Sequence, residues 1–163
     1  MLLVEANPGD VQLTQETVKD SQYRTNVAVA EDGEVAMAYL RKEGEYADSP
    51  RPDLILLDLR LPKKDGSEMM AEIYADEDLA RIPIIILTGT EAEQRLLESY
   101  DIPANRFLNK PMTLSRFDNV IRLMSLAGGL PRRMPIPQTP AEQIAQPVGE
   151  EEKKKGWWPF GRR

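Results

Sequence analysis

The sequence of 163 residues contains neither cysteine nor histidine. Without cysteine, disulfides, thiol catalysis and cysteine-ligated metal sites are excluded. Without histidine, the chain cannot carry a phosphohistidine, and it cannot form a Ser-His or Cys-His nucleophile pair. Both absences narrow the classes of enzyme to which the chain could belong.

Long apolar runs are also missing. No run approaches the length needed to cross a bilayer. The amino terminus opens directly into a predicted strand, with neither the basic start nor the apolar core of a signal peptide. From these two observations we expect a cytoplasmic protein. The apolar content of 41% and the charged content of 29% are those of a soluble globular protein.

Positive charge is scarce except near the carboxyl terminus. The net charge is −6, and residues 128–163 carry seven Lys or Arg and four Asp or Glu, a net +3, which leaves −9 for residues 1–127. This excess of negative charge argues against general nucleic-acid binding. Nothing after Gly128 resembles a DNA-binding helix-turn-helix. We therefore expect the protein to act through contact with another protein.

Three short apolar runs, each typical of a strand buried in a parallel sheet, lead to polar side chains. In open α/β sheets the carboxyl ends of the strands border one crevice. There a carboxylate can accept a phosphoryl group, a hydroxyl can hydrogen-bond one of its oxygens, and an ammonium can neutralise another. The runs and the residues that follow them are 53–57 with Asp58, 84–87 with Thr88, and 106–109 with Lys110.

Helical periodicity between these strands predicts an α/β protein in which five strands alternate with five helices. Right-handed crossovers then give an open parallel sheet with helices on both faces. We expect Asn7 to cap the first helix, Ser67 to cap the third, and Gly44 to end the second. The predicted strands are 1–5, 25–29, 53–57, 84–87 and 106–109; the predicted helices are 8–20, 34–42, one from Ser67, 91–100, and one with an inward stripe of Leu114, Phe117, Ile121 and Met124.

Four groups of short motifs surround the strand ends. They are Leu2-Leu3-Val4-Glu5 with Asn7-Pro8, Leu56-Leu57-Asp58-Leu59 with Leu61-Pro62 and Asp65-Gly66, Leu87-Thr88-Gly89, and Asn109-Lys110-Pro111. Over residues 1–127 they resemble the CheY-like receiver domains of bacterial response regulators. That resemblance implies a three-layer α/β/α fold with strand order 2-1-3-4-5.

The resemblance also implies roles for individual residues in a two-component phosphorelay. Asp58 matches the phosphoacceptor, Thr88 the switch hydroxyl, and Lys110 the partner of the phosphoryl group. Phe107 matches the aromatic switch position. Pro111 follows the lysine, and in receivers the bond between them is cis, so we expect a cis Lys110–Pro111 peptide.

The short form of these motifs looks most like small single-domain regulators that are paired with phytochrome-type histidine kinases. This narrower resemblance implies a sensor histidine kinase and a downstream protein as partners. It also suggests a homodimer through the fourth helix, fifth strand and fifth helix. On this interpretation the chain is not an enzyme, beyond slow self-dephosphorylation.

The departure from the family pattern lies at the end of the first strand. Receivers usually place two adjacent acidic residues there, which help to hold Mg²⁺, whereas this chain has Glu5 and Ala6. Ala6 occupies the position that normally coordinates the ion directly. We expect Asp58, the backbone carbonyl of Arg60, Glu5 and water to hold Mg²⁺ more weakly.

This departure leaves two functional interpretations open. In the first, a histidine kinase still phosphorylates Asp58; we favour it because Asp58, Thr88 and Lys110 all remain. In the second, the domain is a pseudo-receiver that binds partners without phosphorylation. A phosphatase of the haloacid-dehalogenase class is disfavoured, since that family places a second Asp where Arg60 stands.

The last segment, residues 128–163, carries six prolines and little apolar periodicity. It cannot bury enough apolar surface to offset the entropy of ordering, so we expect it to be disordered. It ends with Trp157-Trp158-Pro159-Phe160 beside basic residues. This cluster suits a docking peptide for a partner or a contact with a membrane surface, and the alternative is an unstructured tail.

Overall fold

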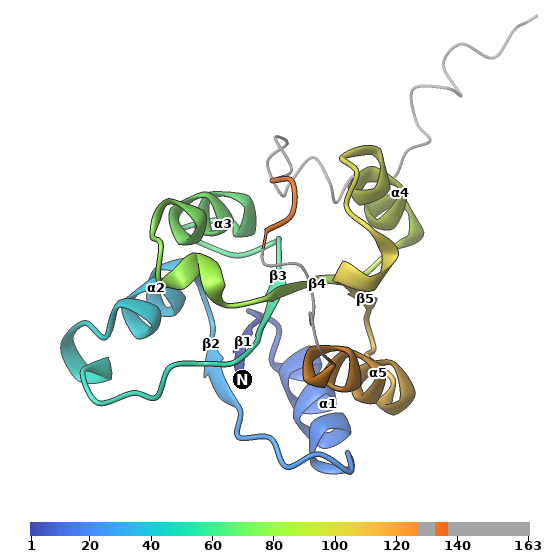
Figure 1. The fold of residues 1–163 in the computed structure, drawn as a ribbon, viewed down its shortest axis with the longest axis horizontal. Helices are drawn as coiled ribbons and strands as arrows, with labels where there is room; N and C mark the ends of the chain where they lie inside the picture. The colour runs from blue at the N-terminus through green and yellow to red at the C-terminus, as the bar shows by residue number, and fades with distance from the viewer. Residues whose placement is uncertain (127–132, 137–163) are drawn as a thin grey trace, which may run out of the picture.

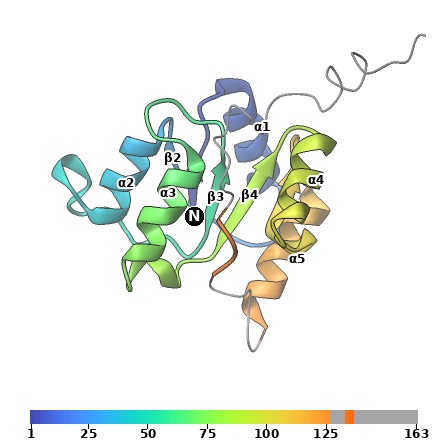
Figure 2. The same ribbon diagram turned by 90° about the horizontal axis from the view of Figure 1, so that it is seen from above.

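A computed structural model describes residues 1–126 and 133–136. These residues form a five-stranded parallel sheet in the order β2-β1-β3-β4-β5, flanked by helices (Figures 1 and 2). The predicted three-layer α/β/α fold and strand order are therefore confirmed. The strands are β1 (Leu2–Val4), β2 (Ala28–Ala30), β3 (Ile55–Asp58), β4 (Ile84–Thr88) and β5 (Phe107–Asn109); the helices are α1 (Pro8–Lys19), α2 (Gly33–Arg41), α3 (Gly66–Ala75), α4 (Glu91–Ser99) and α5 (Leu114–Ser125), with short 3-10 helices η1 (Gly44–Tyr46), η2 (Leu79–Arg81) and η3 (Ala104–Arg106).

The core consists of two apolar layers, one on each face of the sheet. Successive side chains of a strand point to opposite faces, so Ile55 and Leu57 of β3 pack with α2, α3 and α4, while Leu56 packs with α1 and α5. All three are completely buried. Burying a side chain of this size contributes about 1.5–3 kcal/mol. Because both faces are covered, the strand is continuously apolar until it reaches Asp58.

Helix α1 begins as the sequence predicts. The side chain of Asn7 accepts hydrogen bonds from the backbone N–H groups of Gly9 and Asp10, at 2.9 and 3.2 Å. Pro8 occupies the first helical position, where its missing N–H costs little. This start fixes the first turn of α1 directly after β1, at the carboxyl edge of the sheet. None of the helices within the described residues is long and apolar enough to cross a membrane.

The predicted cap of α3 is wrong. Asp65, not Ser67, is the N-cap: its side chain accepts the N–H of Glu68 at 2.9 Å, and the Glu68 side chain accepts the N–H of Asp65 at 3.1 Å. The helix starts at Gly66, where a Cβ would lie only 2.6 Å from the Cα of Leu59. Ser67 is then already inside the first turn and buried.

Two other boundaries differ from the prediction. Helix α2 ends at Arg41, one residue before the predicted end at position 42, because Lys42 and not Gly44 caps the helix in the left-handed conformation, with φ of 57°. Strand β2 covers 28–30 instead of 25–29, because its pairing with β1 sets Leu2 opposite Ala28. Neither shift moves a predicted site residue.

The two carboxyl-terminal helices are anchored differently. In α5, Phe117 and Val120 are buried, but Leu114 is 39% exposed, so the predicted inward stripe is wrong at its first member. Leu114 is the first residue of the helix, one turn away from the contact with the sheet. In α4, Leu97 is the one completely buried apolar side chain, so this helix is only lightly anchored to the sheet.

Residues 133–136 differ from the predicted disorder. Met134 is buried in the same apolar layer as α3 and α4, and the Arg133 guanidinium donates a 2.9 Å hydrogen bond to the backbone carbonyl of Tyr74. The segment lies beside α3 in both views (Figures 1 and 2). The rest of the predicted disordered tail, including Trp157-Trp158-Pro159-Phe160, lies outside the described residues.

Candidate functional site

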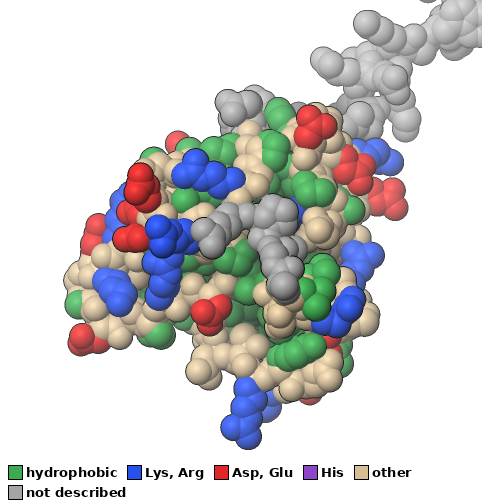
Figure 3. Space-filling model, in the orientation of Figure 1, with side chains coloured by type: hydrophobic (Ala, Val, Ile, Leu, Met, Phe, Trp, Pro, Cys, Tyr) green, Lys and Arg blue, Asp and Glu red, His purple; other side chains and the backbone are tan. Residues whose placement is uncertain are grey.

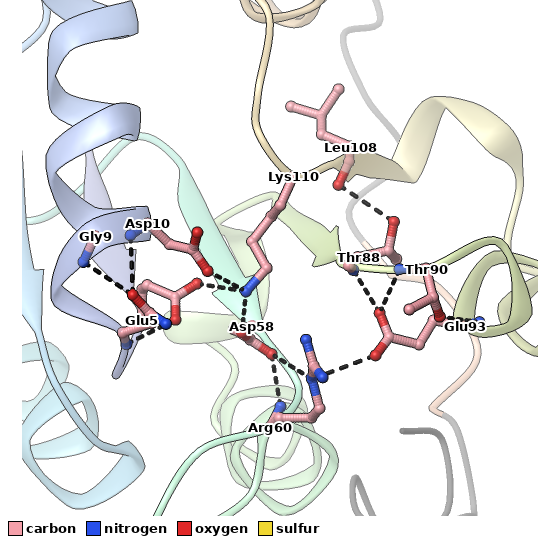
Figure 4. Close-up of polar contacts among 12 residues, drawn as sticks. Glu5, Gly9, Asp10, Asp58, Arg60, Thr88, Thr90, Glu93, Leu108 and Lys110 are labelled. Carbon is pink, nitrogen blue, oxygen red and sulfur yellow. Dashed lines mark hydrogen bonds and ion pairs between the residues drawn. The ribbon is translucent and has the colours of Figure 1, made fainter. Parts of the chain in front are cut away.

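Asp58 lies where the sequence predicts, at the carboxyl end of β3, and is almost completely buried. Its Oδ1 accepts a 2.7 Å hydrogen bond from the backbone N–H of Arg60. Its Oδ2 lies 2.6 Å from the Nζ of Lys110 (Figure 4). The strand end and the loop after β5 therefore bring the predicted phosphoacceptor and its predicted lysine partner into direct contact.

Lys110 is the centre of a cluster of carboxylates. Its Nζ also lies 3.0 Å from Oε2 of Glu5 and 2.9 Å from Oδ2 of Asp10. The expected cis peptide between Lys110 and Pro111 is present. One ammonium thus meets three carboxylates, from the residue after β1, from α1 and from β3, which Figure 4 shows converging on it.

The contacts of Lys110 decide its charge state. Burial alone would lower its pKa, but hydrogen bonds and attraction to Asp58, with hydrogen bonds to Asp10 and Glu5, raise the pKa above the usual lysine range. Burial raises the pKa of Glu5, and the nearby Asp58 carboxylate raises it further, although hydrogen bonds from the Asn7 N–H and Lys110 oppose the shift. The lysine is therefore a fixed positive charge beside Asp58.

Asp10 was not predicted as a member of this cluster. It stands in the first turn of α1, three residues after the Asn7 cap. A helix that follows a strand without a long loop starts at the edge where the strand ends. The acidic residue in that first turn was the available signal.

Thr88 is at the end of β4 and is buried, and its hydroxyl is directed toward β5. It makes weak hydrogen bonds with the backbone carbonyl of Leu108 at 3.4 Å and with Oδ1 of Asn109 at 3.5 Å. Phe107, at the predicted switch position on β5, is only 7% exposed and packs in the same apolar layer as Leu97. The ring is therefore held inward in this structure.

Arg60 closes the site on the side of α4. Its Nε lies 3.9 Å from Oδ1 of Asp58 and 3.3 Å from Oε1 of Glu93, a buried residue that sequence reasoning missed. Beneath it, Asp58, Arg60, Thr88, Glu93 and their apolar neighbours enclose a cavity of only about 10 Å³. Figure 4 shows Arg60 between the two carboxylates. The space next to Asp58 is therefore bounded by cations on two sides.

The comparison with protein families agrees with this geometry. A family model described as response regulator receiver domain matches residues 1–122. The chain belongs to the response regulator receiver domain family.

Receiver domains of known identity are close in sequence and in fold. Response regulator Rcp1 of Synechocystis sp. is 46% identical over 114 residues, which cover 70% of this chain and 78% of that protein. The structure of the phosphorylated cyanobacterial phytochrome response regulator RcpA is 46% identical, with a TM-score of 0.60, and covers 74% of this chain and 86% of that one. The Mn²⁺-bound form of Rcp1 is 40% identical, with a TM-score of 0.59, over 82% of this chain and 96% of that one.

Two carboxylates of this receiver are suitable ligands for Mg²⁺. Within residues 1–126 and 133–136, no three His, Cys, Asp or Glu side chains are arranged to hold a metal ion. Of the three carboxylates around the Lys110 ammonium, Glu5 and Asp58 are the pair that the sequence predicts for Mg²⁺, and each has an oxygen within 3.0 Å of that ammonium. Mg²⁺ commonly uses one or two carboxylates and several waters, so this pair is sufficient in kind.

Proposed function

We propose that this receiver domain is a single-domain response regulator that accepts a phosphoryl group on Asp58 from a histidine kinase. The observation that carries the proposal is the contact of 2.6 Å between the buried Asp58 carboxylate and the Lys110 ammonium at the carboxyl edge of the sheet. A buried carboxylate beside a fixed cation can act as a nucleophile toward a phosphoryl group whose charge that cation neutralises.

The chemistry is a transfer between two nucleophiles. A carboxylate oxygen of Asp58 forms the new O–P bond as the N–P bond to the kinase histidine breaks, and the electron pair leaves with the imidazole. Lys110 stays charged, because its pKa is raised, and neutralises a phosphoryl oxygen. Mg²⁺, held by Glu5, Asp58 and the backbone carbonyl of Arg60, would supply further charge neutralisation. The product is lost only by slow hydrolysis, so the protein is a phosphoacceptor and not an enzyme.

The partners follow from the relatives. Since RcpA is a phytochrome response regulator with 46% identity, we infer a phytochrome-type histidine kinase as phosphodonor. The expectation of a cytoplasmic location rests on the sequence and is kept as part of the proposal. The output is a contact with a downstream protein through α4, β5 and α5, a surface that can also form a homodimer. On the face in Figure 3, acidic and basic side chains are interspersed, which favours protein partners over nucleic acid.

Phosphorylation of Asp58 is tested by intact-mass measurement with a small phosphodonor and Mg²⁺. We expect one phosphoryl mass unit on the native chain and none on Asp58→Asn. Asp53→Asn is the matched control, because Asp53 precedes the same strand but is exposed, and it should be phosphorylated normally. An adduct that persists in Asp58→Asn would move the phosphoacceptor elsewhere.

One observation favours the second function, a pseudo-receiver. Ala6 supplies no carboxylate at the position where related domains carry one, so we expect weak Mg²⁺ binding. Titration calorimetry of the native chain and Ala6→Asp measures this, and the variant should bind Mg²⁺ several-fold more tightly. Equal affinities would show that residue 6 does not face the ion, and no adduct at any Mg²⁺ concentration would establish the pseudo-receiver.

A further inference from the structure

Arg60 connects the phosphoacceptor to helix α4. Its backbone N–H binds Asp58 Oδ1, while its side chain reaches Oε1 of Glu93 at 3.3 Å. The guanidinium lies directly over Gly89: a Cβ on that residue would be 2.8 Å from Nη2 of Arg60. Glycine therefore leaves the space through which this side chain spans from the β3–α3 loop to α4 (Figure 4).

Glu93 holds the first turn of α4 in place. Its Oε2 accepts the backbone N–H groups of Gly89 and Thr90, and its own N–H donates to Oγ1 of Thr90 at 3.2 Å. Its Oε1 is buried and has no hydrogen-bond partner within the described residues, so the charge of Arg60 is what balances it. A buried carboxylate is costly unless it is paired. The position of this turn therefore depends on Arg60.

We propose that Arg60 is a positioning residue that exchanges Glu93 for the phosphoryl group when Asp58 is modified. This inference rests on the proposed function. A phosphoryl group brings about two negative charges and three strong acceptor oxygens. A guanidinium binds such oxygens with paired hydrogen bonds, and Arg60 already lies 3.9 Å from Asp58. The phosphoryl group carries more negative charge than the Glu93 carboxylate, so Arg60 binds the phosphoryl group instead of Glu93.

The exchange transmits the modification of Asp58 to α4 through a change in electrostatic interactions. Once Arg60 turns to the phosphoryl group, Glu93 is buried without a cation and is repelled by the new negative charge. It then moves toward solvent, and the N–H groups of Gly89 and Thr90 lose their acceptor. Leu97 is the one completely buried apolar side chain of α4, so the helix is lightly anchored. Its first turn can therefore move together with Glu93.

Protein NMR with Mg²⁺ and beryllofluoride, which mimics the phosphoryl group, tests the exchange. In the native chain we expect saturating beryllofluoride to shift the Arg60 side-chain Nε–H signal and the backbone amides of Gly89, Thr90 and Glu93. In Arg60→Gln the affinity for beryllofluoride should fall several-fold, and at saturation the amide shifts in α4 should be less than half of the native ones. In Glu93→Gln, whose amide oxygen can still accept both N–H groups, the α4 response should be lost and the affinity should rise.

Arg95→Gln is the matched control, because Arg95 forms an exposed ion pair with Glu91 on the same helix. It should respond to beryllofluoride as the native chain does. Native-size α4 shifts in Arg60→Gln would overturn the exchange while leaving phosphorylation of Asp58 intact. A native chain that does not respond to beryllofluoride at all would overturn the proposed function and, with it, the exchange.

Discussion

At the level of single residues, the site is defined by an imbalance of charge. Lys110 contacts three carboxylates, those of Glu5, Asp10 and Asp58, and Arg60 is shared between Asp58 and Glu93. Carboxylates thus outnumber the cations around the phosphoacceptor. If Lys110 or Arg60 moves away, the carboxylates that it had separated repel one another. The crevice is therefore sensitive to added negative charge.

We expect Lys110→Met to destabilise the fold in a pH-dependent manner. Removing one partner from a buried cluster leaves unpaired charge, which costs about 3–5 kcal/mol near neutral pH. The pKa of Glu5 is already raised in the folded state and should rise further. A folded acid with a raised pKa binds more protons than the unfolded chain, so the stability of the variant should recover as the pH falls below neutral.

Urea unfolding at several pH values, without divalent ions, measures this dependence. In the native chain the raised pKa of Lys110 stabilises the fold below the ordinary lysine pKa, and this contribution is lost only as strongly alkaline pH is approached. Lys19→Met is the control, since Lys19 is exposed at the end of α1, and it should follow the native profile. A deficit of Lys110→Met that stays constant with pH would contradict the charge argument.

At the level of the elements, the site is built from residues at the ends of strands and from residues at the starts of helices. The sequence predicts the first group better than the second. Asp58, Thr88 and Lys110 were predictable because each closes or follows an apolar run. Asp10 and Glu93 were missed: each is an acidic residue in the first turn of a helix, and only the folded chain shows that its side chain turns into the crevice. Thr88 was placed correctly, but its hydroxyl orientation toward β5 is a property of packing.

The start of α3 separates the two candidate caps. We expect Asp65→Ala to lower the free energy of unfolding by about 0.5–2 kcal/mol, because it removes the side chain that accepts the Glu68 N–H. Ser67→Ala should be neutral or slightly stabilising, since the buried Ser67 hydroxyl has no hydrogen-bond partner within the described residues. Denaturant unfolding of both variants decides, and a larger loss for Ser67→Ala would restore the serine as the important group.

At the level of the whole molecule, the domain includes a segment that composition assigns to the tail. Residues 133–136 lie among prolines and carry no periodic pattern, so nothing local predicts order. Their polar contacts include two with Tyr74, about sixty residues earlier: the Arg133 guanidinium lies 5.8 Å from the ring centre, and the Met134 N–H donates to the hydroxyl at 3.4 Å. Burial raises the pKa of Tyr74, so the hydroxyl stays protonated there.

Arg133 places a positive charge at the carboxyl end of α3. The last turn of that helix contains no basic residue, and the carbonyls at a helix end lack the intrahelical partners that the others have. The guanidinium donates to the Tyr74 carbonyl in that turn, where a cation also interacts favourably with the helix dipole. Contacts of this kind depend on the fold already being formed, which is why the sequence alone predicts a domain end at residue 127.

The test of this extended boundary is Met134→Ala. Met134 is 7% exposed and packs in the apolar layer with α3 and α4. Truncating a buried methionine costs about 2–5 kcal/mol, and the lower end is expected here because the segment lies at the edge of the layer. Leu126→Ala is the control, since Leu126 is 53% exposed, and it should change stability by less than about 0.5 kcal/mol. If denaturant unfolding gave equal values for the two variants, residues 133–136 would contribute nothing to the fold, and the domain would end where the sequence predicts.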